Sequence, residues 1–493
     1  MPGQRSNSLS RRALLRFTGA ITLLAVTPLV QACSSSPGAT PPSGSGSAGA
    51  TTSQPTAAKP AGTAASGTSA APATQGNTAS GGKQTVEVWT GYGQGRMATA
   101  REDAINHFNQ TNPKFEAKHV LVPWGNIHDK VIAATAAKNP PDVYRGWSWI
   151  VGTDAPIGGL TQLDDYIKAE TNFNLDDFWP PTLYQMKYQG KIFAVSCSTI
   201  VNLLFYNKDR MQQAGLDTTS LPTDLEGWEA YGSKMMEMNG GRLAKIGFIP
   251  FIPPSDAYSL FNWGAAFGGT FYNDDTSKVT ANDPANVKVL QWFKTYADKY
   301  GAANIQAFVS SYGGNNFGRN TPDGVYYTGL LAIWNIGCWN YNDMKEYGPK
   351  VNFGVTKMPM PKGVQGKPGQ LNANMYLVPK GAKNPEGGFA ICKFMSSDPW
   401  VAAHFEGVPD SVPPSRQSLA TSGEVAKLAP WFSLMIDALH QALPFPSMPG
   451  VNPYFQSLSE AVQSVLFKNA NPQQVLDEVT KKTQQDVDKA LKK

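Results

Sequence analysis

Aromatic side chains stand beside amides in several short stretches of this 493-residue chain. Trp147 and Trp149 flank a serine, and Trp339 and Tyr341 lie in the stretch AIWNIGCWNYN. A flat aromatic face can stack on the CH face of a sugar, while neighbouring amide and hydroxyl groups hydrogen-bond to its hydroxyls. These stretches favour a sugar site, although core packing is the commoner use of any single tryptophan.

Enzyme chemistry has little support in the sequence. The chain contains no G-x-S-x-G, H-E-x-x-H or G-x-x-x-x-G-K-[ST] motif. Glycoside hydrolysis needs two carboxylates that face each other across the scissile bond. Three acidic pairs could in principle supply them, but their surroundings are typical of helix starts and a turn: Asp164-Asp165, Asp176-Asp177 and Asp274-Asp275. A secreted carbohydrate-active enzyme remains an alternative.

No cofactor or metal is expected. The stretch GYGQG at residues 91–95 is followed by Arg96, where the dinucleotide fingerprint has glycine, and no acidic residue ends a second strand about 20 residues on. Five scattered histidines do not form a metal motif. The spacing of Cys197, Cys338 and Cys392 excludes a paired-cysteine metal site and favours buried small hydrophobes.

The N-terminus is typical of an export signal, which we place at residues 1–32. Four arginines precede an apolar run at 17–30 that is too short to span a bilayer. Ser10 to Arg16 resembles a twin-arginine motif, and Leu29 to Cys33 resembles a lipobox, so lipidation of Cys33 is expected. Residues 33–83 then form a Ser/Gly/Ala/Thr/Pro tether without core-forming side chains. The sequence thus predicts an exported protein held near a membrane.

The formal charge of +5 comes from this signal. Beyond residue 32, 38 basic residues face 37 acidic ones. Binding to nucleic acid requires clustered Lys and Arg, so the balance argues against it. The roughly 410 residues from Gln84 onward exceed what one core usually serves, which makes two domains the expectation.

Alternating strands and helices indicate an α/β fold with a parallel sheet. Expected strands cover 85–89, 116–122 and 246–250, and expected helices cover 97–109 and 126–137. Thr223 to Glu226 matches a capping box that would open a helix toward Met238. Asp283 and Pro284 should begin a helix that Gly301 ends. Two amphipathic helices are expected near 454–465 and 475–487.

Several longer stretches resemble one known family in order and spacing. They are GKIFAVSCSTIVNLLFYNKDRMQQAGLD, LPTDLEGWEAY, GLLAIWNIGCWNYNDMKEY, VNFGVTKMPMPKG and MYLVPKGAKNPEGGFAICKFM. Together they look like the extracellular solute-binding proteins of family 1, the maltose-binding type that serves ABC importers. The resemblance runs from about Thr85 to the C-terminus. It implies a two-lobed periplasmic-binding-protein fold of type II, in which each lobe is a mainly parallel sheet flanked by helices and the ligand lies in the cleft.

The resemblance also implies lobe boundaries. Lobe 1 is expected at 84–198, completed by a segment near 338–375. Lobe 2 is expected at 199–337, completed by segments within 376–493, and the first crossing should lie near Cys197 to Val201. Two departures leave the solute undefined: Ile200 stands where maltose binders have an acidic residue, and Cys338 replaces a usual proline.

Residues matched by motif are the candidates for ligand contact. For Trp263 a packing role is equally open, Asn372 accompanies Asn374, and Trp124 is assigned no role. The candidates are Gly91, Tyr92, Gln94, Trp147, Ser148, Trp149, Trp263, Trp339, Tyr341 and Asn374. The implied function is capture of a mono- or oligosaccharide by a monomeric lipoprotein that delivers it to an ABC permease and its ATPase. A non-sugar solute such as a polyamine or peptide is the alternative within the binding class.

Overall fold

The computed structural model describes residues 82–91, 95–252, 256–312, 321–407, 411–428 and 430–492. The expected signal, the lipidation site Cys33 and most of the tether lie outside these residues, as do the candidate contacts Tyr92 and Gln94.

The strands are short except for one. They are β1 (Gln84–Gly91), β2 (Phe115–Val122), β3 (Val143–Trp147), β4 (Lys187–Tyr188), β5 (Lys191–Ile192), β6 (Ala194–Asn207), β7 (Glu237–Asn239), β8 (Arg242–Phe248), β9 (Tyr272–Asn273), β10 (Lys278–Val279), β11 (Leu331–Gly337), β12 (Phe353–Lys357), β13 (Gln370–Leu377) and β14 (Leu443–Pro444).

Helices separate most of these strands along the chain. They are α1 (Gly95–Thr111), α2 (Ile127–Ala136), α3 (Trp149–Asp154), α4 (Asp164–Ala169), α5 (Pro180–Gln185), α6 (Lys208–Gln213), α7 (Leu225–Lys234), α8 (Ala257–Ala266), α9 (Pro284–Tyr300), α10 (Ala302–Ser311), α12 (Asn340–Tyr347), α13 (Pro385–Ser397), α14 (Pro399–Val401), α15 (Gln417–Ala420), α16 (Gly423–Leu428), α17 (Ile436–Gln441), α18 (Val451–Lys468) and α19 (Pro472–Leu491). Turns of other helix types lie at η1 (Trp124–Asn126), η2 (Ala155–Ile157), η3 (Ala402–Gly407) and η4 (Pro430–Leu434).

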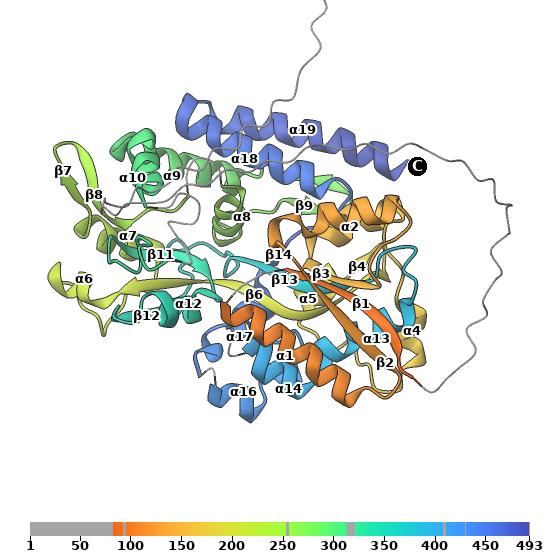
Figure 1. Cartoon of the computed structure of the whole chain (residues 1–493). Coiled ribbons are helices and arrows are strands. Elements are labelled where there is room, and N and C mark those ends of the chain that lie inside the picture. Colours follow the sequence, from red (N-terminus) through yellow and green to blue (C-terminus); the bar gives the residue numbers. More distant parts are fainter. Residues whose placement is uncertain are drawn as a thin grey trace, which may run out of the picture. The chain divides into compact units, whose positions relative to one another are not determined.

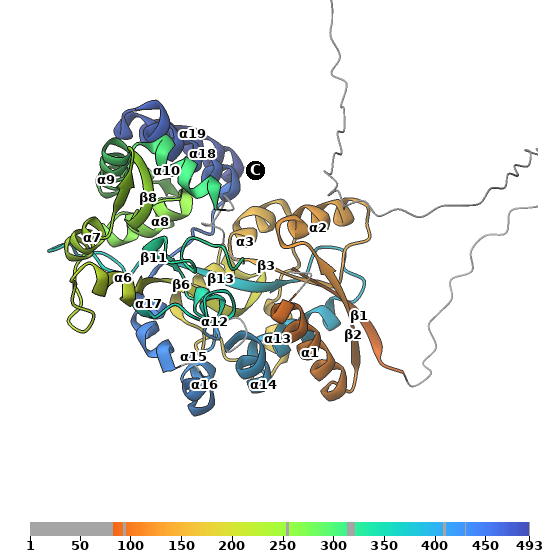
Figure 2. The same ribbon diagram turned by 60° about the vertical axis from the view of Figure 1, so that its left-hand side comes forward.

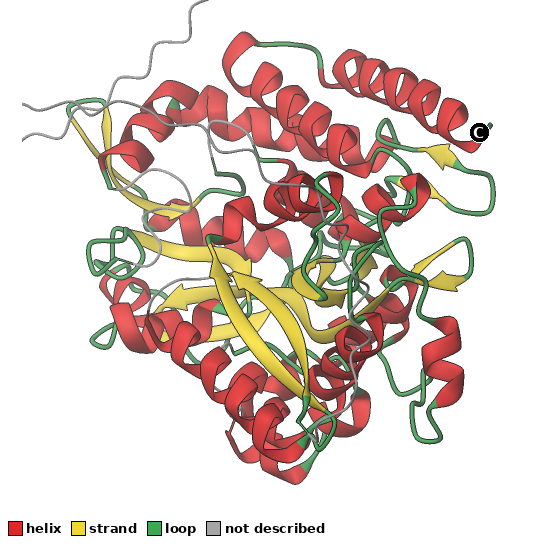
Figure 3. Ribbon diagram, turned by 45° about the vertical axis from the view of Figure 1, so that its right-hand side comes forward, coloured by secondary structure: helices red, strands yellow, loops and turns green. Residues whose placement is uncertain are grey.

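One mixed sheet runs through the centre of the fold, in the order β2-β1-β3-β13-β6-β11-β8-β7, with β12 on β6 and β14 on β13 (Figure 3). The neighbours β1–β2, β1–β3, β8–β11 and β13–β14 are parallel, whereas β6 and β13 pair antiparallel with their neighbours in the main order. The expected α/β class with helices around a large sheet is therefore confirmed, and the sheet is mixed rather than mainly parallel.

Helices cover both faces of the β1–β3 part of the sheet. α1 and α13 lie on one face and α2 on the other, as both ribbon views agree (Figures 1 and 2). The burial of β1 explains the need for cover, because Val86 and Val88 alternate with exposed residues and are themselves fully buried. Apolar side chains at every second position form the sheet face that a helix must pack against.

The buried apolar residues form two separate cores. The first contains residues between Val86 and Cys197 and then Ala373 to Val401, and the second contains Trp179 and residues from Val201 into α19. Strand β6 belongs to both, since residues 194–201 pair with β13 and residues 202–207 pair with β11 and β12. The border on β6 lies between Cys197 and Val201.

The segment that completes the first core differs from the expected boundary. Cys338, Met358 and Leu371 pack in the second core, and the chain returns to the first core only at Ala373. The cause is the pairing, because β11 and β12 pair with the second half of β6. The first core is thus completed by 373–401 rather than by 338–375.

Helix starts follow the expected capping chemistry with one shift. The Asp283 side chain accepts a hydrogen bond from Ala285 N at the start of α9, and Gly301 ends that helix with φ of 78°. In the second capping signal, Asp224 rather than Thr223 is the cap and accepts from Gly227 N. The helix ends at Lys234, because the chain turns there into the β7–β8 hairpin.

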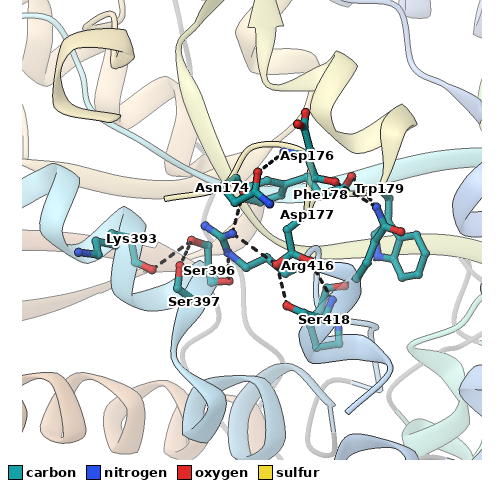
Figure 4. Close-up of polar contacts among 12 residues, drawn as sticks. Asn174, Asp176, Asp177, Phe178, Trp179, Lys393, Ser396, Ser397, Arg416 and Ser418 are labelled. Atoms are coloured by element: carbon teal, nitrogen blue, oxygen red, sulfur yellow. Dashed lines mark hydrogen bonds and ion pairs between the residues drawn. The ribbon is translucent and has the colours of Figure 1, made fainter. Parts of the chain in front are cut away.

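A buried arginine fastens the segment that leads from α14 back to the second core (Figure 4). The Arg416 guanidinium donates to the carbonyl oxygens of Ser396 and Asn174 at 3.1 and 3.0 Å, lies 3.5 Å from Asp177 Oδ2, and covers the Phe178 ring at 4.5 Å. The side chain therefore joins its own segment to the loop at residues 174–178 and to the C-terminal end of α13.

Candidate functional site

Residues of both cores line a cavity of about 770 Å³. The side of the first core contributes the loop after β2, strand β3 and the start of α3, and the second core contributes α8, β11 and the start of α18. Loops beyond the carboxyl ends of the strands of an α/β sheet are the usual place for a ligand. The cavity is therefore the candidate site.

Three tryptophans form the wall on the side of the first core. The Trp124 and Trp147 rings meet edge to face with centroids 4.4 Å apart, and the Trp147 and Trp149 rings stack at 5.5 Å with an interplanar angle of 17°. All three line the cavity. Packing each ring against the next fixes its orientation before any ligand arrives, which reduces the entropy lost on binding.

A buried polar group lies behind this wall. His128 Nε2 lies 2.9 Å from Asp154 Oδ2, and the His128 ring meets the Trp149 ring at 5.1 Å. Burial raises the pKa of Tyr144, and the neighbouring Asp154 raises it further. Since a buried polar group must be hydrogen-bonded to avoid a large desolvation penalty, the pair fixes α2 and α3 relative to each other.

Two glycines let tryptophan rings lie on the backbone. A Cβ at Gly91 would be 1.9 Å from Trp124 Cε3, and a Cβ at Gly337 would be 2.3 Å from Trp339 Nε1. Both tryptophans line the cavity. Neither ring could keep its position above any other residue type.

The wall on the side of the second core is also aromatic. Trp339 follows β11, Tyr258 begins α8, Phe455 lies on α18, and Phe445 precedes α18. The Tyr258 ring meets the Phe445 and Phe455 rings at 5.6 and 5.1 Å. Aromatic surfaces therefore face the cavity from both cores.

Amides of strand β13 line the cavity between these walls. Gln370, Asn372 and Asn374 occupy every second position and share one face of the strand, where all three line the cavity. Asn372 Oδ1 accepts hydrogen bonds from Ser148 Oγ and from Ala373 N, at 2.6 and 2.8 Å. Because a backbone N–H can only donate, these bonds fix the amide orientation, and its two N–H groups, for which the described residues offer no acceptor, are left for the cavity.

A second row of amides is oriented in the same way. Asn262 Oδ1 accepts from Gln370 N, so its Nδ2 donates to Asn335 Oδ1. Asn202 Nδ2 donates to the same oxygen at 3.2 Å, and Asn202 and Asn335 both line the cavity. The lining therefore presents amide donors and acceptors in fixed directions.

One carboxylate and one guanidinium stand in the lining, those of Asp256 and Arg145. Asp256 caps α8 by accepting from Ser259 N and also accepts from Ile252 N. Burial raises the pKa of Asp256 and these hydrogen bonds oppose the rise. Arg145 lies over the Trp124 ring at 5.3 Å. The formal charges of the described lining cancel.

The predicted contact residues fall into three groups. Trp147, Trp149, Trp339 and Asn374 line the cavity. Gly91 and Ser148 lie directly behind it, against Trp124 and Asn372.

The third group lies elsewhere. Trp263 is fully buried in the second core, where its indole N–H donates to Pro250 O at 2.9 Å. Tyr341 stacks on Trp431 at 4.3 Å and is absent from the lining. Tyr92 and Gln94 lie outside the described residues. Ligand contact by any of these residues remains a prediction.

The sequence reasoning missed several lining residues. Trp124 was given no role, although it follows a strand that is parallel to β1 and so ends beside Gly91. Gln370 could have been found from the alternation of amides and apolar residues in QLNANMYL. Asp256 and Tyr258 carried no local signal, since an aspartate before a helix is an ordinary cap.

No group of three or more His, Cys, Asp and Glu side chains among the described residues could hold a metal ion. Within the same ranges, no helix has the length and apolar character required to cross a membrane. Cys197, Cys338 and Cys392 are buried, and burial raises the pKa of the Cys392 thiol.

Two cores that share a sheet and enclose a ligand-sized cavity define a binding protein of the type II periplasmic class. The family of bacterial extracellular solute-binding proteins matches residues 103–430, and the chain belongs to this family. The resemblance expected from the sequence motifs is thereby confirmed.

Known relatives are distant in sequence. The chain is 24% identical over 306 residues to the arabinooligosaccharide-binding protein of Bacillus subtilis (strain 168). This match covers 58% of this chain and 63% of that protein. It is 22% identical over 389 residues to the galactooligosaccharide-binding protein of the same strain, covering 76% and 84%.

Solved structures share the fold. CpMnBP1 with mannotriose bound is 25% identical with a TM-score of 0.69, covering 81% of this chain and 99% of that one. The GacH receptor of Streptomyces glaucescens GLA.O, solved unliganded and with acarbose, is 22% identical with a TM-score of 0.65, covering 82% and 99%.

Proposed function

We propose that this protein captures a neutral oligosaccharide between its two cores and delivers it to the permease of an ABC importer. The single observation that carries the proposal is the cavity, in which tryptophans of both cores flank oriented amides. Sugar rings present CH faces that stack on indole and hydroxyls that both donate and accept hydrogen bonds. The ligands named for the relatives, arabinooligosaccharide, galactooligosaccharide and mannotriose, support the same class.

The cavity volume favours several rings over one. At about 770 Å³ it lies in the upper part of the range of about 300–1,000 Å³ that holds drug-sized ligands. An oligosaccharide would fill such a space and touch both cores at once. A ligand with contacts to both cores stabilises the closed arrangement through those extra contacts.

The alternatives have weaker support. Binding of a polyamine would require several carboxylates, whereas the described lining has Asp256 and a compensating Arg145. Glycoside hydrolysis requires two carboxylates about 5 to 10 Å apart, and the same lining offers one. We therefore infer a binding role without catalysis, served by no cofactor.

Membrane attachment through a lipid on Cys33 is part of this proposal. A lipidated Cys33 and the tether that follows it would hold the folded body at the outer face of the cytoplasmic membrane, close to the permease and its ATPase. We infer a monomer that works there without binding nucleic acid.

A thermal-shift screen of residues 84–493 tests the function. The panel is mannotriose, maltotriose, arabinotriose and galactobiose, with spermidine and a tripeptide as non-sugar solutes. A ligand at 100 times its Kd adds about 2.7 kcal/mol to the stability of the folded state. A rise in Tm with a sugar that is recovered intact supports the proposal. A rise with spermidine or tripeptide alone contradicts it, and a consumed sugar would indicate an enzyme.

A further inference from the structure

We propose that Gln370 is a specificity-determining residue that accepts a hydrogen bond from a hydroxyl of the bound oligosaccharide. This inference rests on the proposed function and adds a named contact to it. Gln370 begins β13 and lines the cavity, yet only 4% of its surface is exposed. Its side-chain oxygen Oε1 is buried and has no hydrogen-bond partner within the described part of the chain.

The backbone of Gln370 is held firmly, so the unpartnered oxygen does not result from a loose strand. Gln370 N donates to Asn262 Oδ1 at 3.1 Å, and the residue pairs with Leu443 of β14. Asn262 is itself fixed by its bond to Asn335. A buried acceptor without a partner costs free energy, and rotation of the side-chain amide of this cavity-lining residue would bring the oxygen to a ligand donor that recovers that cost.

The neighbouring amide gives the direction of recognition. Asn372 lies two residues along the same strand face, about 7 Å away, and its orientation leaves N–H donors for the cavity. A hydrogen-bond donor and an acceptor at this spacing suit a ligand in which each successive group can both donate and accept a hydrogen bond. Hydroxyls meet that requirement, whereas ammonium groups can only donate and carboxylates can only accept.

The test is Gln370→Met, which keeps the length of the side chain and removes the amide. Mannotriose is the first probe, replaced by the best-binding sugar of the panel if that binds more tightly to the unmodified protein. Calorimetric titration should show binding about tenfold weaker or more, the effect of one lost hydrogen bond to a buried group. The Tm of the unliganded variant should be unchanged or higher, because the Gln370 side chain makes no hydrogen bond to the described residues that the substitution could remove. Gln370→Glu keeps the acceptor oxygen and should bind more tightly than Gln370→Met.

Gln185 supplies a matched control. It is equally buried and its Oε1 also has no partner among the described residues, but its Nε2 donates to Leu371 O at 3.0 Å and it is absent from the lining. Gln185→Met should therefore lower the Tm of the unliganded protein.

Each result is decisive. Undiminished sugar binding by Gln370→Met overturns the inference and leaves the proposed function standing. A fall in the unliganded Tm like that of Gln185→Met assigns Gln370 a structural role and also overturns it. Failure of the unmodified protein to bind any sugar of the panel overturns the proposed function, and this inference with it.

Discussion

The indole of Trp149 meets the imidazole of His128 edge to face, with ring centroids 5.1 Å apart and an interplanar angle of 85°. On its other side His128 lies within hydrogen-bond distance of the buried Asp154 carboxylate. A cavity-lining ring is thus supported by a polar pair that is absent from the lining.

Replacing His128 by Ala should therefore affect both stability and binding. Asp154 would stay buried without its partner, which costs about 1–3 kcal/mol or more for a charged group. We expect a fall of about 2–3 kcal/mol in the free energy of unfolding, measured with urea, and weaker binding of mannotriose. Lys130→Ala, an exposed change on the same helix, should stay within about 0.5 kcal/mol. An unchanged unfolding free energy in His128→Ala would contradict the support described here.

Gly91→Ala should weaken ligand binding without disturbing the packing of the core. The new methyl group would lie 1.9 Å from Trp124 Cε3, so the ring must move from its edge-to-face contact with Trp147. We expect sugar binding about tenfold weaker and altered tryptophan fluorescence. Gly125→Ala is the matched change, because a Cβ there meets nothing within 4 Å. Equal affinities for the two variants would show that the position of Trp124 does not matter for binding.

Two tryptophans should respond in opposite ways. Trp147→Ala removes a lining ring and should weaken sugar binding more than it lowers stability. Trp263→Ala leaves a hole in the second core and an unpaired Pro250 carbonyl, for an expected loss of about 3–5 kcal/mol. Trp263→Phe retains most of the volume, so its affinity for sugar should match the unmodified protein. Calorimetric titration and urea unfolding together separate the two effects, and weak binding by a stable Trp263→Phe would place that residue in the site after all.

Asp256 should make stability depend on pH. Its pKa is raised by burial in the folded protein, against about 3.9 in an unfolded chain. The folded state therefore holds the proton more tightly, so this group's contribution to stability is largest below the unfolded value and is lost as pH rises through the folded value. Asn caps a helix as well as Asp does and carries no charge. Relative to the unmodified protein, the free energy of unfolding of Asp256→Asn should thus be higher at pH 7 than at pH 4. The substitution should stabilise the folded state more at pH 7.

Asp217 provides the control of opposite sign. Its pKa is lowered by hydrogen bonds from Thr219 and Ser220. The contribution of Asp217 to stability is present above the ordinary pKa of an aspartate and is lost as pH falls. Relative to the unmodified protein, the free energy of unfolding of Asp217→Asn should therefore be lower at pH 7 than at pH 4. The same trend in both variants would rule out the environment assigned to Asp256.

Local chemistry predicted the elements well where one residue dominated the signal. Asp283 before Pro284 marks the start of α9, because proline is favoured in the first turn and the residue before it takes the cap. In the sequence Thr223-Asp224 two good caps compete, and the structure uses the second. Boundaries between the cores were harder, because they depend on which half of β6 each later strand joins, and pairing of distant strands leaves no local trace.

The sequence predicted only part of the candidate site, for a related reason. Trp263 and Tyr258 lie on one helix, α8, in equally aromatic surroundings, yet one faces the core and the other the cavity. Composition cannot distinguish the two faces. Trp124 and Trp147 meet only because β1 pairs with both β2 and β3, a relationship between segments that are far apart in the chain.

The shared strand β6 also limits how the two cores can move. A hydrogen-bonded strand of 14 residues is already extended and cannot lengthen. One core therefore cannot translate away from the other in the direction of β6. What remains is rotation, by bending or twisting of the backbone where the Asn374–Met375 bulge interrupts the pairing of β13 with β6. Displacement in a rotation grows with distance from the axis. The aromatic walls furthest from β6 would therefore move most. The amides of β13 would stay nearly in place, so each sugar would meet the same hydrogen-bonding groups before and after the rotation.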